Sequence, residues 1–441
     1  MSGGIAQAIR DAGVVGAGGA GFPTHVKADS QVDIVIANGS ECEPLLYSDQ
    51  SLQEMQAREI IAGLETMMQA TGAQQGIIAL KAVYTEAIAS YDELLPAHPD
   101  LSMVKLGAFY PSGDEHSLVY ECTGRIVPEG GIPLNVGVVV DNVETLYNVH
   151  KAMTGIPVTE RVVTITGDVW SPGVYRLPVG TPVKDAVALA GGAKIEDPGY
   201  IDGGPMMGAI HFELDGVIRK TTSGIIVAPS DHPHLQRRSL QPNMELIRTV
   251  SMCCQCRECT DLCPRYQLGH NLEPHKVMRA VITRSDDPPS QITQAHICCL
   301  CGICETIACP LYLSPRNVFA LMKKELAAKG VSNPHHRTPD SVRHAYNYTK
   351  IPKERALARC GMTQYSGHLH FKQHDTSIRK VELLLSQHIG APSHPAVEEG
   401  QVVNKGDLIA GIPEGKLGAN LHASISGRVT AVRTDRIVIE G

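Results

Sequence analysis

Cysteine is concentrated in one short stretch of this chain. Ten of its thirteen cysteines lie between Cys253 and Cys309, in a sequence of 441 residues. A small secreted protein that relies on disulfides spreads its cysteines along the whole chain. Clustering within a long chain favours metal binding instead, so this stretch is predicted to fold around a metal group.

The spacing of these cysteines indicates which kind of metal group. One run reads Cys253-x2-Cys256-x2-Cys259-x3-Cys263-Pro264, and the other reads Cys298-x2-Cys301-x2-Cys304-x4-Cys309-Pro310. Such runs hold [4Fe–4S] clusters, because three closely spaced cysteines wrap one cluster and the fourth ligates the partner cluster. The prediction gives one cluster the ligands Cys253, Cys256, Cys259 and Cys309, and the other the ligands Cys298, Cys301, Cys304 and Cys263.

Some alternatives stay open at this point. The second run has one residue more than the first before its last cysteine, and this insertion could re-aim Cys309. Cys254 and Cys299 sit beside predicted ligands but outside the regular spacing. Zinc sites also use C-x2-C, although as pairs of pairs rather than as longer runs, so zinc is the alternative interpretation.

Composition narrows the class of protein. The chain has 39 basic and 46 acidic residues, a formal charge of −7, which argues against nucleic acid as a partner. No apolar run approaches the roughly 18 residues that span a bilayer. Residues 1–9 also lack the pattern of a signal peptide. These features predict a soluble cytoplasmic protein that does not insert into membranes.

Beyond the cysteines, the chain changes pattern several times. Apolar runs at 32–37 and 76–81 alternate with helical patterns at 5–12, 52–71 and 85–95, which favours an α/β layer. Residues 161–190 predict a hairpin and then a capped helix, as in a β-grasp module. Residues 333–376 are polar and predict a loosely ordered connector, and short strands beyond 388 suggest a small all-β module.

The N-terminal region contains two features of a ligand site. Gly16, Gly18 and Gly21 fit G-x-G-x-x-G, but a helix precedes them and Phe22-Pro23 follows, so the ordinary dinucleotide fingerprint fails. Bare glycines still let a ring or a phosphate approach the backbone. The segment Asn38–Pro44 then follows a predicted strand, where α/β proteins bind ligands. On local evidence alone, a plain turn with surface carboxylates explains these residues equally well.

Four motifs together resemble known redox proteins. They are GAGGAGFPTHVK, NGSECEP, YPSGDE at 110–115 and DNVETL at 141–146. They resemble the flavin- and NADH-binding subunit of respiratory complex I and the C subunit of Rnf complexes. The resemblance is strongest, and covers almost the whole chain, to the cobalamin (corrinoid) reductases of propanediol-utilisation bacterial microcompartments. Rnf C subunits usually carry their barrel-sandwich module first, whereas this chain places it at 387–441.

The resemblance implies a multidomain α/β protein. Its expected segments are a Rossmann-like FMN/NADH-binding domain at 1–155, a β-grasp (SLBB) module at 156–240, a helical ferredoxin-like domain with two [4Fe–4S] clusters at 241–330, a connector at 331–380 and a barrel-sandwich, lipoyl-like module at 381–441.

It also implies roles for individual residues. Gly16, Gly18, Gly19 and Lys27 match the loop that cradles the flavin, and Asn38, Ser40 and Glu41 match its polar contacts. Phe22, Glu43 and Glu115 match positions near the nicotinamide and adenine, where Glu43 and Glu115 would act in catalysis, and Tyr110 and Gly113 match the pocket wall. Asn142 and Thr145 match contacts to the flavin phosphate or ribityl chain. Ser40 replaces the family's acid, and Cys42 also departs from the complex I pattern.

The activity implied is electron transfer from NADH through FMN and two [4Fe–4S] clusters to a corrinoid. Such a flavoprotein oxidoreductase reduces cob(III)alamin towards cob(I)alamin for regeneration of adenosylcobalamin. Its implied partners are a corrinoid adenosyltransferase and microcompartment shell proteins, and its implied location is the microcompartment lumen. The alternatives are an Rnf C-like subunit that reduces a protein acceptor, and a non-enzymatic scaffold that only holds clusters.

Three smaller features complete the predictions. Trp170 is predicted to pack in the core of the β-grasp module. Met206 and Met207, after Gly203-Gly204-Pro205, predict a buried turn. Cys42, Cys122 and Cys360 have no ligand-like neighbours in the sequence and are predicted to be ordinary buried thiols.

Overall fold

The first domain is built on a parallel sheet whose strands are apolar on both faces. The computed structural model describes residues 2–283, 290–372 and 378–441. The sheet order is β3-β2-β1-β5, and the strands are β1 (Ile34–Asn38), β2 (Gln75–Lys81), β3 (Leu101–Leu106) and β5 (Val138–Asn142). Strands of this composition require cover on both sides. One face packs against α1 (Ser2–Asp11), α3 (Ser48–Thr71), α4 (Thr85–Leu94) and α6 (Val143–Met153), and the other against α5 (Glu115–Thr123).

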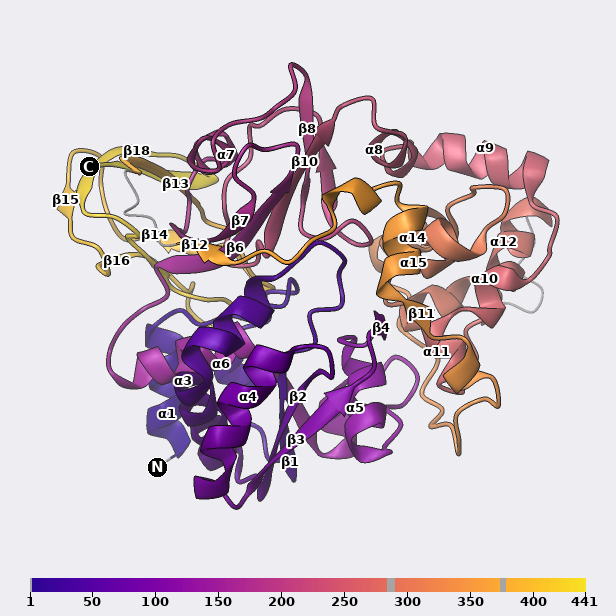
Figure 1. Cartoon of the computed structure of the whole chain (residues 1–441), viewed down its shortest axis with the longest axis horizontal. Helices are drawn as coiled ribbons and strands as arrows, with labels where there is room; N and C mark the ends of the chain where they lie inside the picture. Colours follow the sequence, from indigo (N-terminus) through magenta and orange to yellow (C-terminus); the bar gives the residue numbers. More distant parts are fainter. Residues whose placement is uncertain (1, 284–289, 373–377) are drawn as a thin grey trace.

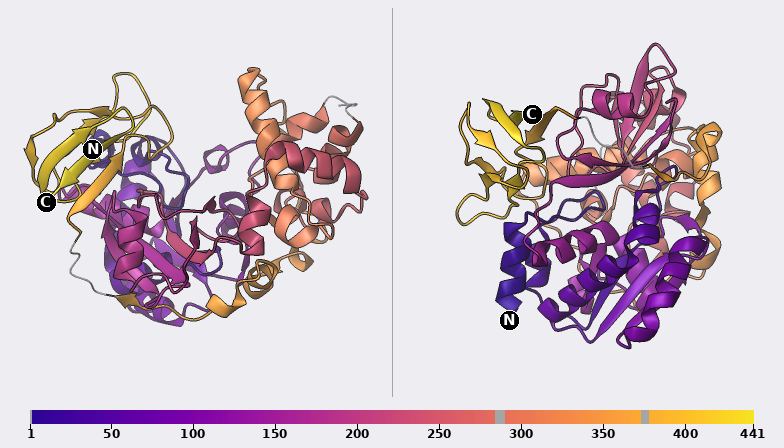
Figure 2. Two further views of the ribbon diagram at one scale, coloured as in Figure 1. Left: turned by 90° about the horizontal axis from the view of Figure 1, so that it is seen from above. Right: turned by 60° about the vertical axis from the view of Figure 1, so that its left-hand side comes forward.

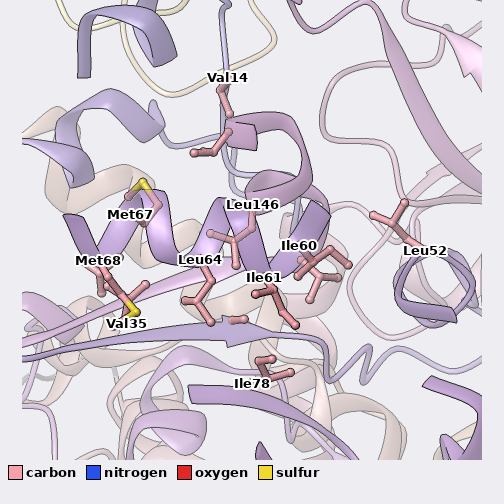
Figure 3. Packing of buried hydrophobic residues seen from close by; sticks show 14 of the residues in the cluster. Val14, Val35, Leu52, Ile60, Ile61, Leu64, Met67, Met68, Ile78 and Leu146 are labelled. Atoms are coloured by element: carbon pink, nitrogen blue, oxygen red, sulfur yellow. The ribbon is translucent and has the colours of Figure 1, made fainter. Parts of the chain in front are cut away.

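Helix α3 supplies much of this core. Ile60, Ile61 and Leu64 are buried and lie over Val35 and Ile78 of the sheet (Figure 3). Burial of one such side chain contributes about 1.5–3 kcal/mol. The helix continues to Thr71 and ends at Gly72, which has a φ of 74° that other residues rarely adopt. The predicted α/β layer is therefore confirmed.

The strand order creates a switch point between β1 and β5. From β1 the chain passes to β2 on one side, whereas β5 pairs with β1 on the other side. Connections that leave in opposite directions open a crevice at the carboxyl ends of such strands. Asn38 and Asn142, the last residues of β1 and β5, are register partners at this edge.

The second module is a mixed sheet in the order β12-β7-β6-β10-β8-β9, in which β12 (Phe371–Lys372) comes from a later part of the chain, and α7 (Val183–Leu189) covers one face. Its strands are β6 (Glu160–Gly167), β7 (Gly173–Pro178), β8 (Pro198–Asp202), β9 (Ala209–His211) and β10 (Gly224–Pro229). The predicted hairpin and helix are present. The prediction for Trp170 is wrong: it lies in the turn between β6 and β7 and is 68% exposed, with the Lys194 ammonium over its ring.

The cysteine-bearing region is helical. Its helices are α8 (Pro233–Arg238), α9 (Pro242–Met252), α10 (Glu258–Asp261), α11 (Pro264–Gln267), α12 (Pro274–Thr283), α13 (Ser290–Thr293) and α14 (Pro315–Ala328). Figure 2 shows this region and the C-terminal module at opposite ends of the molecule, with the first domain and the β-grasp module between them.

The expectation of a loosely ordered connector is wrong for residues 346–372. They form η5 (Tyr346–Tyr348), β11 (Ile351–Pro352), α15 (Lys353–Arg359), η6 (Thr363–Tyr365) and β12 (Phe371–Lys372). Strand β11 pairs with β4 (Phe109–Tyr110), and β12 extends the β-grasp sheet beside β7 (Figure 1). This segment forms regular elements although it has few apolar residues, because Ile351, Ala356 and Leu357 are buried against other modules. Residues 373–377 of the connector lie outside the described residues.

The C-terminal module consists of two small sheets around one apolar core. The sheets have the orders β13-β19-β18-β15 and β14-β16-β17. Their strands are β13 (Lys380–Leu384), β14 (His394–Pro395), β15 (Val402–Val403), β16 (Leu408–Gly411), β17 (Leu421–His422), β18 (Gly427–Val432) and β19 (Arg436–Glu440). Among the described residues, no helix is long and apolar enough to cross a bilayer.

Candidate functional site

The switch point holds many of the residues predicted from the sequence. The Asn38 amide donates to the Gly113 carbonyl at 2.9 Å, which joins the end of β1 to the segment before α5. The Asn142 side chain accepts from Glu144 N at 2.9 Å and so caps α6. Its amide also donates to Asp49 at 2.7 Å. Motifs distant in sequence therefore meet at the carboxyl ends of β1 and β5.

The glycine loop lies over this edge and leaves open space. A Cβ on Gly18 would lie 3.6 Å from Asn142 Cβ, and a Cβ on Gly19 would have no atom within 4 Å. The Ala17 amide donates to Thr145 Oγ1 at 2.9 Å. Thr145 thus holds the loop from below, and its predicted contact to a flavin phosphate stays a prediction.

Lys27 is tied to the protein at the end of β5. Its ammonium donates to the Val140 carbonyl at 2.6 Å and pairs with Asp141 at 3.2 Å. Burial would lower the Lys27 pKa, but Asp141 and Glu115 outweigh burial and raise it. Glu115 is 3.9 Å away and half exposed. Lys27 is therefore a charged group that is already paired with two carboxylates, and its predicted contact to the flavin stays a prediction.

Three buried carboxylates around the site each keep an oxygen without a partner among the described residues. These atoms are Glu41 Oε2, Glu43 Oε1 and Asp141 Oδ2. Burial raises the pKa of all three groups, and it raises the Glu43 pKa to about 6. A buried polar atom without a partner is costly. Glu43 is turned towards the β-grasp module, but the open loop and the unpartnered oxygens of Glu41 and Asp141 fit a bound group that offers hydroxyl or N–H donors, such as FMN.

The remaining predicted wall residues lie where β1, β4 and α5 meet. Ser40 Oγ and Ser112 Oγ are 2.7 Å apart, and a Cβ on Gly113 would overlap the Ser40 carbonyl. The Phe22 carbonyl accepts from the amide of Gly16 at 2.8 Å, which closes the glycine loop. Glu43 faces away from this wall, because its Oε2 accepts from the Met206 amide of the β-grasp module at 2.9 Å.

The cysteines form two pockets of similar size, with about 370 and 360 Å³ of empty space. The first is lined by Cys253, Cys256, Cys259 and Cys309, with Cys254 beside them. The second is lined by Cys298, Cys301, Cys304 and Cys263, with Cys299 beside them. These are the two sets assigned from the sequence. Among the described residues, no group of three or more His, Cys, Asp or Glu is placed to hold a single metal ion.

Both cysteine loops share one backbone pattern. Gln255 and Arg257 in the first run have φ values of 56° and 73°, and Leu300 and Gly302 at the matching places of the second run have 57° and 80°. Residues other than glycine pay a cost in this left-handed region and keep it only where the surroundings demand it. Because both loops adopt the same unusual turn, each of them fits a bound group of the same kind.

The extra residue of the second run is absorbed by a π-helical turn, η4 (Cys304–Ala308), where the first run has the α-helical turn α10. Single π turns often occur at functional sites. Cys309 therefore still faces the first pocket. The widened turn also presents the Thr306 carbonyl to Arg359 at 3.1 Å, and the Glu305 carbonyl to Arg237.

The second pocket faces the first domain. Tyr110 Oη donates to the Cys301 carbonyl at 2.6 Å, and Arg265, which follows Cys263-Pro264, pairs with Asp114 at 2.8 Å. Burial raises the pKa of Cys298 to about 12. At the first pocket, Cys254 and Cys256 are exposed.

Sequence reasoning missed several residues at these junctions. Asp114, Arg265 and Met206 join separate modules, and the buried pair Glu144–Arg161 joins α6 to β6. Asp114 and Glu144 lie within the motifs YPSGDE and DNVETL, and Met206 lies in the turn predicted to be buried. No pattern along the chain showed that these residues join modules.

Comparison with known proteins bears on the family. The chain is 41% identical over 438 residues to the cobalamin reductase PduS of Salmonella typhimurium, with 99% of this chain and 96% of the relative's length covered. The PduS of Citrobacter freundii is 42% identical over 441 residues, with the same coverage. This chain belongs to the PduS cobalamin reductase family.

Four family models match segments of this PduS family member. They are the Nuo51 FMN-binding domain at 9–151, the SLBB domain at 162–209, the 4Fe-4S dicluster domain at 252–314 and the RnfC barrel sandwich hybrid domain at 368–440. The C subunit of the Na⁺-translocating ferredoxin:NAD⁺ oxidoreductase complex of Acetobacterium woodii is 37% identical over 59% of this chain and 57% of its own length. An NAD⁺-reducing [NiFe]-hydrogenase chain superposes with a TM-score of 0.48 at 20% identity, over 76% of this chain and 64% of its own length.

Proposed function

We propose that this chain is an NADH-dependent oxidoreductase that uses FMN and two [4Fe–4S] clusters to reduce a corrinoid. The observation that carries the proposal is the direct contact between the switch-point site and the second cysteine pocket, through Tyr110 and Asp114. Full-length similarity to PduS cobalamin reductases supports the acceptor. Because NADH yields two electrons, its oxidation to NAD⁺ and H⁺ would reduce two cob(III)alamin molecules to cob(II)alamin, and further turnover would give cob(I)alamin.

The residues of the first site would hold FMN over the ends of β1 and β5. Gly18 and Gly19 would leave room for it, Asn38 and Asn142 would fix the loops around it, and Lys27 would supply positive charge. When bound, FMN accepts a hydride and can pass on electrons singly. Glu115, exposed beside Lys27, is proposed to contact the nicotinamide ribose or ring.

Eight cysteines would ligate the two clusters in the sets assigned above. Burial would keep water away from the second set, which lies between modules, whereas the first set lies nearer to solvent. Because the clusters carry electrons singly, no acid–base group is required at either pocket.

The five segments 1–155, 156–240, 241–330, 331–380 and 381–441 remain our proposed division of the chain.

Association with a microcompartment shell is part of the proposal, and the similarity to PduS proteins supports it. Association with a corrinoid adenosyltransferase is proposed only because such an enzyme would consume the reduced corrinoid. The alternative function is reduction of a protein acceptor as an Rnf C-like subunit. The 37% identity to the Acetobacterium protein over 59% of this chain supports this alternative.

The deciding experiment is anaerobic NADH oxidation with cob(III)alamin or ferredoxin as acceptor. Purified protein should contain FMN, iron and acid-labile sulfide, and NADH should reduce cob(III)alamin faster than ferredoxin. Faster reduction of ferredoxin would support the Rnf C-like alternative. Zinc without acid-labile sulfide would contradict both.

A further inference from the structure

The loop Gly203–Gly208, here called the GGPMMG loop, lies between the first domain and the second cysteine pocket. On the side of the first domain, the Met206 amide donates to Glu43 Oε2 at 2.9 Å. A Cβ on Gly204 would overlap the Glu43 side chain, so the loop and the carboxylate are in direct contact. Glu43 is held in place at the end of the segment that follows β1.

The other side of the loop contacts the second cysteine run. A Cβ on Gly302, between Cys301 and Cys304, would lie 2.9 Å from the Met206 carbonyl. Arg316, which lines the second pocket, donates to the Met207 carbonyl at 3.3 Å. The backbone of Met206 and Met207 thus contacts both the first domain and the second cysteine run.

The Met206 side chain fills the space where four modules meet. It is fully buried in a cluster with Leu45 and Tyr110 of the first domain, Ile303 of the second cysteine run and Cys360 of the connector. Met207 is 47% exposed. Its neighbour therefore points into a shared core, whereas Met207 points to solvent.

The loop is itself rigidly supported. The Pro205 carbonyl accepts from His234 at 2.7 Å and from Arg238 at 3.0 Å, and Arg238 also donates to the Gly208 carbonyl at 2.8 Å. Gly203 has a φ of 105°, which requires glycine. Because these hydrogen bonds hold the loop backbone in place, the loop can fix the position of the residues that pack on it.

We propose that the GGPMMG loop fixes the position of the second cysteine pocket relative to the switch-point site of the first domain. Met206 is the side chain of the loop on which this position depends most. The inference rests on the proposed function and names a positioning residue for it. Tyr110 and Asp114 contact the same pocket directly. Loss of the Met206 side chain should therefore shift the pocket without detaching it.

The test compares Met206→Ala, Met206→Leu and Met207→Ala in the anaerobic holoprotein. Stopped-flow absorbance follows flavin bleaching and cluster bleaching by NADH separately, and dithionite measures the total reducible cluster. In Met206→Ala, flavin bleaching should keep its wild-type rate while cluster bleaching slows several-fold, because electron tunnelling weakens as the distance between the two redox groups grows. Leucine has a similar volume and should restore the rate, and Met207→Ala should match wild type.

Hydrogen–deuterium exchange supplies a readout that does not depend on NADH. Amides at 298–304 should exchange faster in Met206→Ala, but not in Met206→Leu or Met207→Ala. Wild-type exchange at 298–304 together with a wild-type rate of cluster bleaching in Met206→Ala would overturn the inference. If NADH does not bleach the flavin of the wild-type protein, the proposed function is contradicted. The hydrogen–deuterium exchange at 298–304 would still decide the role of the loop.

A second variant covers the case in which Met206→Ala loses flavin or iron. Gly204→Ala pushes on Glu43 from the same loop, and Gly411→Ala is its control, because a Cβ on Gly411 meets no atom within 4 Å. Gly204→Ala should slow cluster bleaching and speed exchange at 298–304, whereas Gly411→Ala should change neither. Identical behaviour of these two variants would count against the loop.

Discussion

At the scale of single residues, the repeated backbone pattern of the cysteine loops separates ligands from their neighbours. In each run the left-handed residues stand at the second and fourth places after the first cysteine. The first cysteine of each run accepts a hydrogen bond from the residue two places on, although the donors differ. Cys298 Sγ accepts from the backbone N of Leu300 at 3.4 Å, and Cys253 Sγ accepts from the side-chain Nε2 of Gln255 at 3.2 Å. Cys254 and Cys299 occupy a different place in the turn.

Adjacent cysteines should therefore differ in their effect on iron content. We expect Cys298→Ser to lose the iron of one cluster, because it removes one of four thiolate ligands. Cys299→Ser should retain full iron, and it is the matched control one residue away. Iron and acid-labile sulfide per chain, measured anaerobically, check this. Loss of iron in Cys299→Ser with retention in Cys298→Ser would reverse the ligand assignment.

At the scale of elements, one ion pair joins the start of α5 to the start of α11. Asp114 caps α5 by accepting from Ser117 N at 3.1 Å and also pairs with Arg265. Burial would raise the Asp114 pKa, but the Arg265 guanidinium outweighs burial and holds it at about 2. The side chains of Asp114 and Arg265 are only 13% and 6% exposed. Removing one charge therefore leaves the other buried.

Asp114→Asn should lower the free energy of unfolding by about 3–5 kcal/mol, because it strands the Arg265 charge between two modules. Asparagine still caps a helix well, so the loss reports the ion pair. The control is Asp33→Asn, whose carboxylate pairs with Arg125 at 3.0 Å but is 70% exposed. It should cost less than about 1 kcal/mol. Urea denaturation of the two variants checks the difference, and equal midpoints would contradict it.

At the scale of the whole molecule, a buried lysine joins three modules. The Lys220 ammonium donates to the Gly13 carbonyl of the first domain and to the Asn420 carbonyl of the C-terminal module, both at 2.7 Å. The Lys220 amide donates to Gln387 Oε1 at 2.9 Å. Because Lys220 lies in the β-grasp module, its side chain is a buried contact through which the C-terminal module is docked on both other modules.

Lys220→Met should loosen the C-terminal module, since two buried carbonyls lose their donor at a cost of about 1–3 kcal/mol each. Faster hydrogen exchange at 404–423, with flavin and iron content unchanged, is the expected result. Lys416→Met, an exposed position of the same module, is the control. Wild-type exchange in Lys220→Met would show that the docking does not depend on this lysine.

The same lysine predicts a pH dependence. Burial lowers the Lys220 pKa to about 7 from an ordinary value of 10.5, and the imidazoles of His388 and His422 face it. Between pH 7 and 10.5 the unfolded chain binds a proton that the folded chain does not, so this group makes the fold more stable as pH rises. Wild type should thus gain stability from about pH 7 to about pH 9 relative to Lys220→Met, as measured by urea denaturation. Parallel pH profiles would contradict the lowered pKa.

Local structure and the two cysteine runs can be predicted from the order of residues alone. Strand and helix periodicity predicts the α/β layer and the hairpin, because these depend on neighbouring residues. The cysteine spacing predicts the sets that line each pocket, because a short loop restricts which thiols can converge.

The contacts between modules are visible only once the chain is folded. The connector forms regular elements because it packs on distant modules, and the Trp170 ring is exposed and contacts the Lys194 ammonium instead of the core. Glu43, Met206 and Gly302 lie in separate modules, yet they form one contact. A contact of this kind depends on how whole modules pack, and no periodicity or spacing along the chain encodes it.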